Sequence, residues 1–291
     1  MVGILIFGSG GQLGHELLRT AWPPGYEPVG LPRLACDIAD AGAVGAALHA
    51  HRPSLAVNAA AYTAVDRAET DREASFRTNG EGPGILGAAC AAQGIPLIHI
   101  STDYVFDGSK NGSYDEADPI APLGHYGTGK AAGESALRAA LDRHVILRTS
   151  WLFGAHGPNF VKTMLRLARE REELAVVADQ HGTPTPADAL AGAIAAVAGA
   201  ILSGRAAWGT YHYAGAEPTT WHGLASATIE EFGRRTGRSV RVRPITTAEY
   251  PTPVRRPANS ALDCARIGRD FGIAAADWRA GLHRVLDELL M

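Results

Sequence analysis

The first half of the chain alternates short apolar runs with segments of helical periodicity. The apolar runs lie at residues 2–7, 27–31, 55–60, 96–101 and 144–150. Helical patterns separate them, at 12–22, near 40–50, up to about 92, and after Tyr126. Runs that are apolar throughout are typical of parallel strands buried on both faces. Repeated strand–helix units therefore predict a doubly wound α/β fold, a dinucleotide-binding Rossmann domain over residues 1–150.

The pattern changes after Trp151, where Pro and Gly become frequent and the strand–helix alternation weakens. Helices are predicted at 159–172, 186–202 and 278–290, and a loop rich in Pro and Arg that lines a site at 243–260. The run 209–215 predicts a strand that returns to the main sheet. We expect residues 151–291 to form mainly a smaller, substrate-binding C-terminal domain.

Composition narrows the class of protein. A chain of 291 residues with 46% hydrophobic and 20% charged residues is ordinary for a soluble globular protein. A net charge of −3 indicates no general attraction to nucleic acid or anionic membranes. No apolar run is long enough to span a bilayer, and the N-terminal run lacks the features of a signal peptide. Three widely spaced cysteines favour a reducing, cytoplasmic compartment, and no Cys/His group has structural-zinc spacing.

A glycine-rich segment, FGSGGQLG (7–14), lies between the first predicted strand and the first predicted helix. Gly8, Gly11 and Gly14 are three residues apart, and Gly10 adds another small position. A dinucleotide site needs a tight turn, close backbone approach to a pyrophosphate, and a helix N-terminus aimed at its charge. The alternative is a plain structural turn, but the position at the first strand–helix junction favours dinucleotide binding.

The end of the second strand bears on the choice of dinucleotide. An acidic residue there would bind the ribose 2′-hydroxyl of NADH, but the sequence is GLPRL (30–34), with Arg33 and no carboxylate. An arginine suits the 2′-phosphate, so NADPH is favoured without excluding NADH, unless Arg33 is only a solvated loop residue. Asp37, followed by Ile38, is a candidate for the adenine end of the site.

Two further motifs carry candidate chemistry. HISTDYVFDG (99–108) follows the fourth strand and delivers Ser101, Thr102 and Asp103 to the edge where open α/β folds bind ligands. YGTGK (126–130) opens the next helix and sets Tyr126 and Lys130 one turn apart on one face. The alternative is a polar pair on a helix surface, but the neighbouring motifs favour catalysis.

These residue types suit the reduction of a ketone. Hydride addition leaves an alkoxide that must be protonated, and a phenol has an ordinary pKa of about 10. An ammonium roughly 4 Å away contributes about 4 kcal/mol at an effective dielectric near 20, which lowers the pKa of Tyr126 toward neutrality. A hydroxyl such as that of Thr102 can hold the carbonyl oxygen as charge develops.

Together these motifs identify a resemblance. The chain resembles the extended short-chain dehydrogenase/reductases and, more narrowly, the dTDP-4-dehydrorhamnose reductase family, over nearly its full length. The likeness rests on FGSGGQLG, STDYVFDG and YGTGKAAGE, and on VNAAAYTAVDRAE (57–69), RTSWLFG (148–154), NFVKTML (159–165), DQHGTPT (179–185), YPTPVRRPANSAL (250–262) and the terminal WRAGLHRVLDEL.

The resemblance implies roles for particular residues. Thr102, Tyr126 and Lys130 would be catalytic, with Asp103 and Trp151 on the sugar. Gly11, Gln12 and Leu13 would contact the cofactor diphosphate, and Ala61, Tyr62 and Thr63 its nicotinamide side. The full cofactor set is Gly8, Gly10, Gly11, Gln12, Leu13, Arg33, Asp37, Ile38, Ala59, Ala61, Tyr62, Thr63, Tyr126 and Lys130.

The substrate side leaves two alternatives open. Trp151 presents a flat apolar face to a deoxysugar or base, or is a core tryptophan. Arg255 and Arg256 are candidates for binding the substrate diphosphate or for ordering their loop. Adjacent side chains rarely face the same way, so at most one of them is expected to do so, and Arg255 is the one assigned to the substrate. Nucleotide-sugar 4,6-dehydratases have an acid after Thr-Asp, where this chain has Tyr104. This argues for simple reduction.

Some relatives are described with Mg²⁺ at a dimer interface. The matching residues here are Glu16, Asp188 and Glu288, with Asp where Glu is expected, so we assign no metal, and Mg²⁺ and a homodimer remain open. The expected reaction is NADPH-dependent reduction of the C4 ketone of dTDP-4-dehydrorhamnose to dTDP-L-rhamnose. The rivals are a reductase of another 4-keto nucleotide sugar and a catalytically silent relative, which the intact Thr102, Tyr126 and Lys130 argue against.

Overall fold

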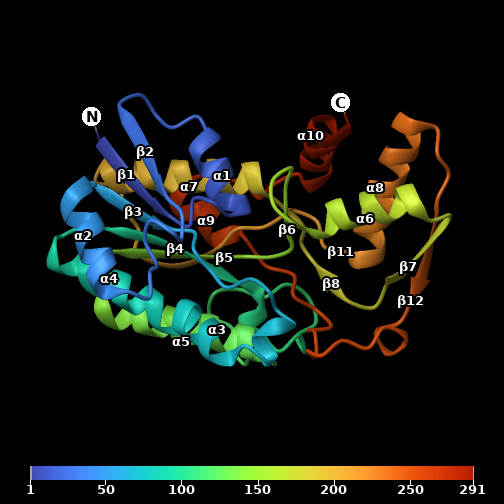
Figure 1. Ribbon diagram of the computed structural model, residues 1–291, viewed down its shortest axis with the longest axis horizontal. Coiled ribbons are helices and arrows are strands. Elements are labelled where there is room, and N and C mark those ends of the chain that lie inside the picture. Colours follow the sequence, from blue (N-terminus) through green and yellow to red (C-terminus); the bar gives the residue numbers. More distant parts are fainter. Residues whose placement is uncertain (1, 291) are drawn as a thin grey trace.

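A six-stranded parallel sheet forms the centre of the computed structural model, which describes residues 2–290 (Figure 1). Its strands, in spatial order, are β10 (Gly209–His212), β5 (His144–Thr149), β4 (Leu97–Thr102), β3 (Leu55–Asn58), β1 (Val2–Phe7) and β2 (Tyr26–Leu31). Every neighbouring pair is parallel, which confirms the predicted α/β class. The strand order reverses between β1 and β3, and such a point is where open sheets bind ligands.

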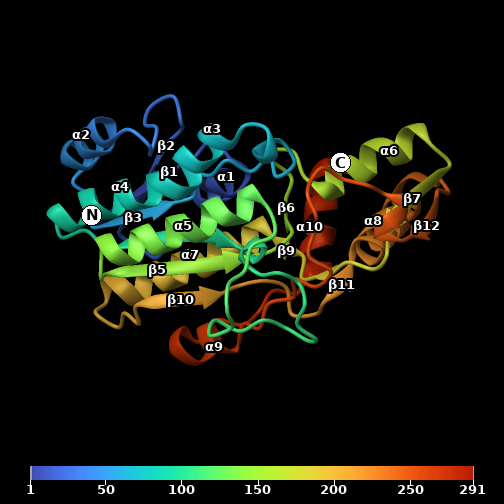
Figure 2. The ribbon, with the colours of Figure 1, turned by 90° about the horizontal axis from the view of Figure 1, so that it is seen from below.

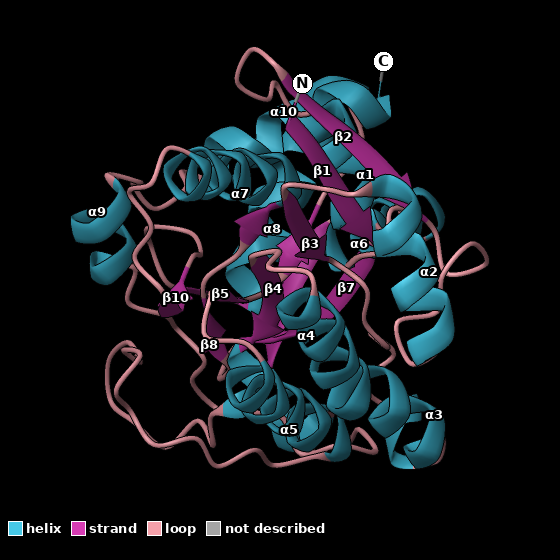
Figure 3. Ribbon diagram, turned by 90° about the vertical axis from the view of Figure 1, so that its left-hand side faces the viewer, coloured by secondary structure: helices cyan, strands magenta, loops and turns pink. Residues whose placement is uncertain are grey.

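Helices cover both faces of this sheet (Figure 3). In β1, Ile4 and Ile6 pack with α1 (Gln12–Arg19) and α7 (Ala187–Leu202). Leu5 and Phe7 point the other way and join the cluster formed with α2 (Ala41–His51), α4 (Gly82–Ala92) and α5 (His125–Ala140). Each fully buried apolar side chain of this size contributes about 1.5–3 kcal/mol. Burial on both faces is the reason that the strands are apolar throughout.

A second hydrophobic core lies beside the sheet, at the right of Figure 2. It is built from α6 (Phe160–Glu170), α8 (Trp221–Thr236), α10 (Trp278–Leu290) and a parallel pair of β7 (Glu173–Val177) and β12 (Arg241–Ile245). Neither α8 nor the β7–β12 pair was predicted from the sequence. The expected loop at 243–260 was wrong at its start, because residues 243–245 belong to β12.

Three elements beyond residue 150 pack on the main sheet and not on this second core. They are α7, β10 and α9 (Ala265–Phe271), and β10 pairs with β5 at the sheet edge. Two short pairs connect the two cores: β6 (Leu152–Phe153) with β9 (Thr185–Pro186), and β8 (His181–Gly182) with β11 (Thr219–Thr220). The chain therefore passes between the two cores several times.

The remaining regular segments are short. They are α3 (Arg72–Phe76), a π-helical turn at Arg77–Glu81, and 3₁₀ turns at Arg67–Glu69, Asp103–Val105 and Thr247–Glu249. Over residues 2–290, no helix combines the length and apolarity needed to cross a bilayer.

Candidate active site

A cleft of about 720 Å³ opens at the carboxyl ends of β1, β4 and β5. It brings together all but one of the predicted site residues. Those that line it are Gly8, Gly10, Gly11, Gln12, Leu13, Arg33, Asp37, Ile38, Ala59, Ala61, Tyr62, Thr63, Thr102, Asp103, Tyr126, Lys130 and Trp151. Segments from both cores contribute, since Asn159 and Trp221 also line the cleft.

The glycine-rich turn after β1 forms one end of the cleft. Gly8 has φ of +83°, and a Cβ atom there would lie 2.5 Å from the amide nitrogen of Ala60. A Cβ atom on Gly14 would lie 2.3 Å from the carbonyl oxygen of Gly8, so the first turn of α1 packs directly on the loop. Gly11 is the N-cap residue of α1, and no side chain caps the helix. The turn therefore presents an uncapped helix N-terminus, which fits a phosphate group.

Gln12 differs in one respect from its expected role. Its side chain donates to the carbonyl of Leu152 at 3.2 Å and accepts from the Asn159 amide at 2.7 Å. It therefore joins the glycine turn to the start of the second core. Asn159, which the sequence reasoning missed, also caps α6 by accepting from the amide of Lys162 at 3.0 Å.

The far end of the cleft carries the charged residues predicted for the adenine side. The guanidinium of Arg33 lies 3.6 Å from the carboxylate of Asp37, and its side chain is 72% exposed. Asp37 also accepts from the amide of Ala39 at 3.0 Å. An exposed guanidinium at the end of β2 fits a phosphate, because its planar donors match phosphate oxygens.

The wall after β3 is formed by backbone as much as by side chains. The amide of Tyr62 donates to the Asn79 side chain at 2.9 Å, and the Tyr62 hydroxyl donates to Asp71 at 3.0 Å. The Tyr62 phenol is thus held by the segment before α3, while Ala61 and Thr63 line the cleft beside it.

Tyr126, Lys130 and Thr102 all line the cleft, and Tyr126 lies within hydrogen-bond reach of Thr102. Lys130 is buried and donates to the carbonyl of Ile100 at 2.6 Å. The Thr102 hydroxyl donates to Asp103 at 3.0 Å and accepts from the amide of Tyr104 at 3.2 Å. Holding a substrate oxygen would require the Thr102 proton to turn away from Asp103.

Burial governs the protonation of these groups. Burial raises the pKa of Tyr126, with the hydrogen bond to Thr102 opposing and the charge of Asp103 adding to the rise. Burial lowers the pKa of Lys130 to about 8, against the opposing charge of Glu134. Lys130 was expected to lower the pKa of Tyr126 toward neutrality, but the pKa of Tyr126 is raised because burial dominates. Tyr126 is instead held protonated at neutral pH, which is the form of a proton donor.

Two stacked tryptophans form the wall toward the second core. The rings of Trp151 and Trp221 lie 3.6 Å apart and nearly parallel, at 7°. Trp151 has φ of +47°, an unfavourable conformation that costs about 1–2 kcal/mol in a residue with a side chain. Gly182 makes room for it, since a Cβ atom there would lie 2.4 Å from the indole. Trp151 therefore lines the cleft and is not only a core residue, and Trp221, at the start of α8, was missed.

Arg255, the predicted substrate-binding arginine, is exposed and does not line the cleft. Arg256 lines the cleft in its place, donating to Asp66 at 3.0 Å and to the Tyr104 hydroxyl at 3.5 Å. Of these two adjacent side chains, only that of Arg256 faces the cleft. Within residues 2–290, the Arg256 Nε and one Asp103 oxygen are among the buried polar atoms that have no hydrogen-bond partner, and both residues line the cleft, which fits a polar ligand there.

Each of the three acidic residues considered for Mg²⁺ lies near a basic side chain. Asp188 accepts from Arg284 at 2.7 Å, and Glu288 accepts from Arg19 at 2.8 Å. Glu16 lies 4.0 Å from the ring of His156. Within residues 2–290, no group of three or more His, Cys, Asp or Glu side chains is arranged to hold a metal ion.

The chain is similar over its whole length to dTDP-4-dehydrorhamnose reductases. The family model described as RmlD substrate binding domain matches residues 1–291. A dTDP-4-dehydrorhamnose reductase of Sinorhizobium fredii is 41% identical over 290 residues, which cover 99% of this chain and 98% of that one. The crystal structure of a dTDP-4-dehydrorhamnose reductase from Clostridium acetobutylicum has a TM-score of 0.92 at 35% identity, with 100% of both chains covered. That of the Bacillus anthracis dTDP-4-dehydrorhamnose reductase, in complex with NADP, has a TM-score of 0.90 at 34% identity and covers 99% of this chain and 100% of that one.

Proposed function

The chain belongs to the RmlD substrate binding domain family, and we propose that it reduces the C4 ketone of dTDP-4-dehydro-6-deoxy-L-mannose with NADPH. The product is dTDP-L-rhamnose, so the reaction is the last step of dTDP-rhamnose biosynthesis. The observation that carries the proposal is the single cleft shared by the glycine turn and by Thr102, Tyr126 and Lys130.

The reaction divides between the cofactor and three side chains. When bound, NADPH supplies a hydride to C4 of the sugar. Tyr126 donates the proton that the C4 oxygen then needs, and the raised pKa of Tyr126 keeps that proton in place beforehand. Thr102 donates a hydrogen bond to the same oxygen. The Lys130 ammonium stabilises the phenolate left on Tyr126 until water protonates it again.

Cofactor and substrate contact different walls of the cleft in this proposal. The uncapped start of α1 holds the cofactor diphosphate through Gly11, Gln12 and Leu13. Trp151, backed by Trp221, contacts the deoxysugar together with Asp103. Arg256 takes the role expected of Arg255 and binds the substrate diphosphate.

The test is an assay of the purified protein with NADPH and dTDP-4-dehydro-6-deoxy-L-mannose. The reaction is monitored by the loss of NADPH absorbance, and the product is then identified as dTDP-L-rhamnose. We expect cofactor oxidation in proportion to sugar reduced. A panel of other 4-keto nucleotide sugars tests the nearest rival, which would be favoured by faster turnover of another member. No oxidation with any sugar would favour the catalytically silent alternative.

The preference for NADPH is proposed to depend on Arg33. Arg33→Ala removes a charged donor from the 2′-phosphate, so KM for NADPH should rise about tenfold while KM for NADH stays within about twofold. Steady-state kinetics with both nucleotides measures this. The matched control is Arg77→Ala, because Arg77 also lies near Asp37, at 3.9 Å, but outside the cleft. An equal loss in the two variants would contradict the role given to Arg33.

We further propose that the protein is located in the cytoplasm and that it binds neither nucleic acid nor membranes. This proposal is supported by the free thiols of Cys36, Cys90 and Cys264 and by the net charge of −3. A homodimer stays a prediction from the resemblance.

A further inference from the structure

A buried polar layer lies between α5 and strands β4 and β5, directly after Lys130 along the helix. Glu134 follows Lys130 by one turn of α5, and its side chain is fully buried. Lys130 itself is 2% exposed and is fixed by the carbonyl of Ile100 at 2.6 Å. A carboxylate and an ammonium thus share a region with little access to water, where charges interact strongly.

Glu134 is held by two arginines. Arg148, on β5, donates from Nε to one carboxylate oxygen at 2.9 Å and from Nη2 to the other at 2.7 Å. Arg138, one turn further along α5, donates to the same carboxylate at 2.7 Å from the solvent side, where it is 36% exposed. This two-pronged geometry leaves the carboxylate no alternative orientation.

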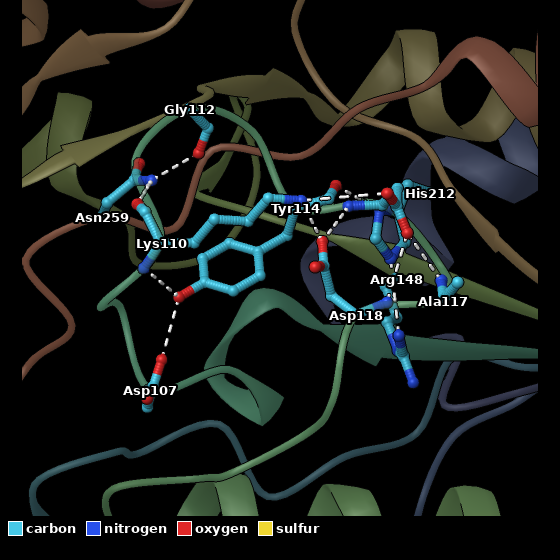
Figure 4. A network of polar contacts seen from close by, with 10 residues as sticks. Asp107, Lys110, Gly112, Tyr114, Ala117, Asp118, Arg148, His212 and Asn259 are labelled. Carbon is cyan, nitrogen blue, oxygen red and sulfur yellow. Dashed lines mark hydrogen bonds and ion pairs between the residues drawn. The ribbon is translucent and has the colours of Figure 1, made fainter.

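Arg148 is in turn held from behind, as Figure 4 shows. Its Nη1 lies 3.5 Å from Nε2 of His212, whose Nδ1 donates to the carbonyl of Tyr114 at 3.1 Å. The ring of Phe106 lies beneath the guanidinium, at 5.2 Å from its central carbon. Glu134 therefore cannot swing toward Lys130, and it acts on Lys130 through its charge.

Some of the titratable groups around Lys130 are neutral and others are charged. The titratable and charged groups that face this layer from β4, β5, β10, α5 and the cleft are His99, Arg148, His144, His212, Glu134, Arg138, Asp103, Tyr104 and Tyr126. Burial holds the pKa of His99 well below its usual range and lowers that of His212 to about 4, so both are neutral. Burial would raise the pKa of Glu134, but Arg148 holds it below its usual range, so Glu134 stays charged.

We propose that Glu134 is a positioning residue for the reduction, whose clamped and buried carboxylate keeps the neighbouring Lys130 ammonium charged on the carbonyl of Ile100. The inference rests on the proposed function for its consequence in catalysis. Its physical content, the charge state of Lys130, is independent of any substrate. Without Glu134, burial acts unopposed and the ammonium gives up its proton near neutral pH.

The chain offers a direct measurement, because it contains only three lysines, Lys110, Lys130 and Lys162. Protein labelled with ¹³Cε-lysine gives three signals, which Lys110→Arg and Lys162→Arg assign. Titration by NMR should show the pKa of Lys130, about 8 in the parent, shifted to lower pH in Glu134→Gln. Arg138→Gln is the matched control, since it removes a contact of the same carboxylate but leaves the carboxylate's charge, and it should not lower the pKa of Lys130.

Turnover should follow the same titration. For Glu134→Gln, kcat should fall about fivefold at pH 8, where half of the parent's Lys130 is charged, and recover to within about twofold of the parent at pH 6.5. An unchanged Lys130 titration, or an equal loss of kcat at every pH, would overturn the inference in favour of a purely structural ion pair. Absence of turnover in the parent protein would refute the proposed function and leave the Lys130 titration as the test.

A second variant guards against loss of folding in Glu134→Gln, which leaves Arg148 charged and unpaired. The double variant Glu134→Gln/Arg148→Met removes both charges of the buried pair, a change that is often tolerated. We expect the Lys130 titration to stay shifted toward acid in this variant. A return to the parent titration would contradict the inference, because only the structural defect would then have been repaired.

Discussion

Replacing Tyr126 by Phe is expected to lower kcat about 1000-fold, with the affinity for NADPH within about twofold of the parent. The substitution removes one hydroxyl and keeps the ring at the start of α5. Without the phenol, the C4 alkoxide must take its proton from water, while the Lys130 ammonium has no phenolate to stabilise. Pre-steady-state turnover with the keto sugar, together with a fluorescence titration of NADPH, separates the chemical step from cofactor binding.

The matched control is Tyr211→Phe, which removes the hydroxyl of another tyrosine far from the cleft. Tyr211 lies on β10, and its hydroxyl donates to Asp270 at 2.9 Å. This variant should lose some stability and keep kcat within about twofold. Turnover of Tyr126→Phe within a few-fold of the parent would remove Tyr126 from the proton-donor role.

Substituting Gly14 by Ala is expected to lower the free energy of unfolding by about 3 kcal/mol and to raise the Kd for NADPH at least tenfold. The new Cβ would lie 2.3 Å from the carbonyl oxygen of Gly8 and 2.5 Å from Cα of Ser9. These are backbone atoms, so α1 and the glycine turn must separate. The separation moves the helix N-terminus away from the cofactor diphosphate. Urea denaturation and NADPH titration measure the two effects.

Gly45→Ala is the control for the same change in another helix. A Cβ atom there meets nothing within 4 Å, so Ala should stabilise α2 by about 0.5–1 kcal/mol. If the free energy of unfolding falls in Gly14→Ala and rises in Gly45→Ala, the loss of stability at Gly14 is explained by the close approach of the backbone and not by helix propensity. Parent-like stability and NADPH affinity in Gly14→Ala would contradict the packing described for the turn.

The main sheet was predictable to within a few residues. The apolar run at 2–7 is the strand β1, and the run at 144–150 contains β5, because buried strands need uninterrupted apolar residues. The helix predicted at 12–22 ends earlier, at Arg19, before the prolines at 23 and 24. The pair of β7 and β12 was not predicted, since each is short and its partner lies far away in the sequence.

Some features of the candidate site were likewise predictable from the sequence, and others were not. Tyr126 and Lys130 lie on one helix face, so their spacing alone predicts their proximity. Asn159 and Trp221 reach the cleft from the second core, and no local pattern in the chain indicates that. Arg255 and Arg256 are adjacent and chemically alike, so the choice between them depends on the direction of the loop in the fold.

The sequence by itself determined the α/β class, the glycine turn and the Thr102, Tyr126 and Lys130 set, because local periodicity and fixed spacing govern these features. Only the tertiary structure decided which arginine faces the cleft and which tryptophan supports Trp151. It also decided how the reactive groups are protonated, since burial raises the pKa of Tyr126 and lowers that of Lys130. The physical reason is that desolvation and the charge of Glu134, clamped by Arg148, depend on segments brought together only by folding.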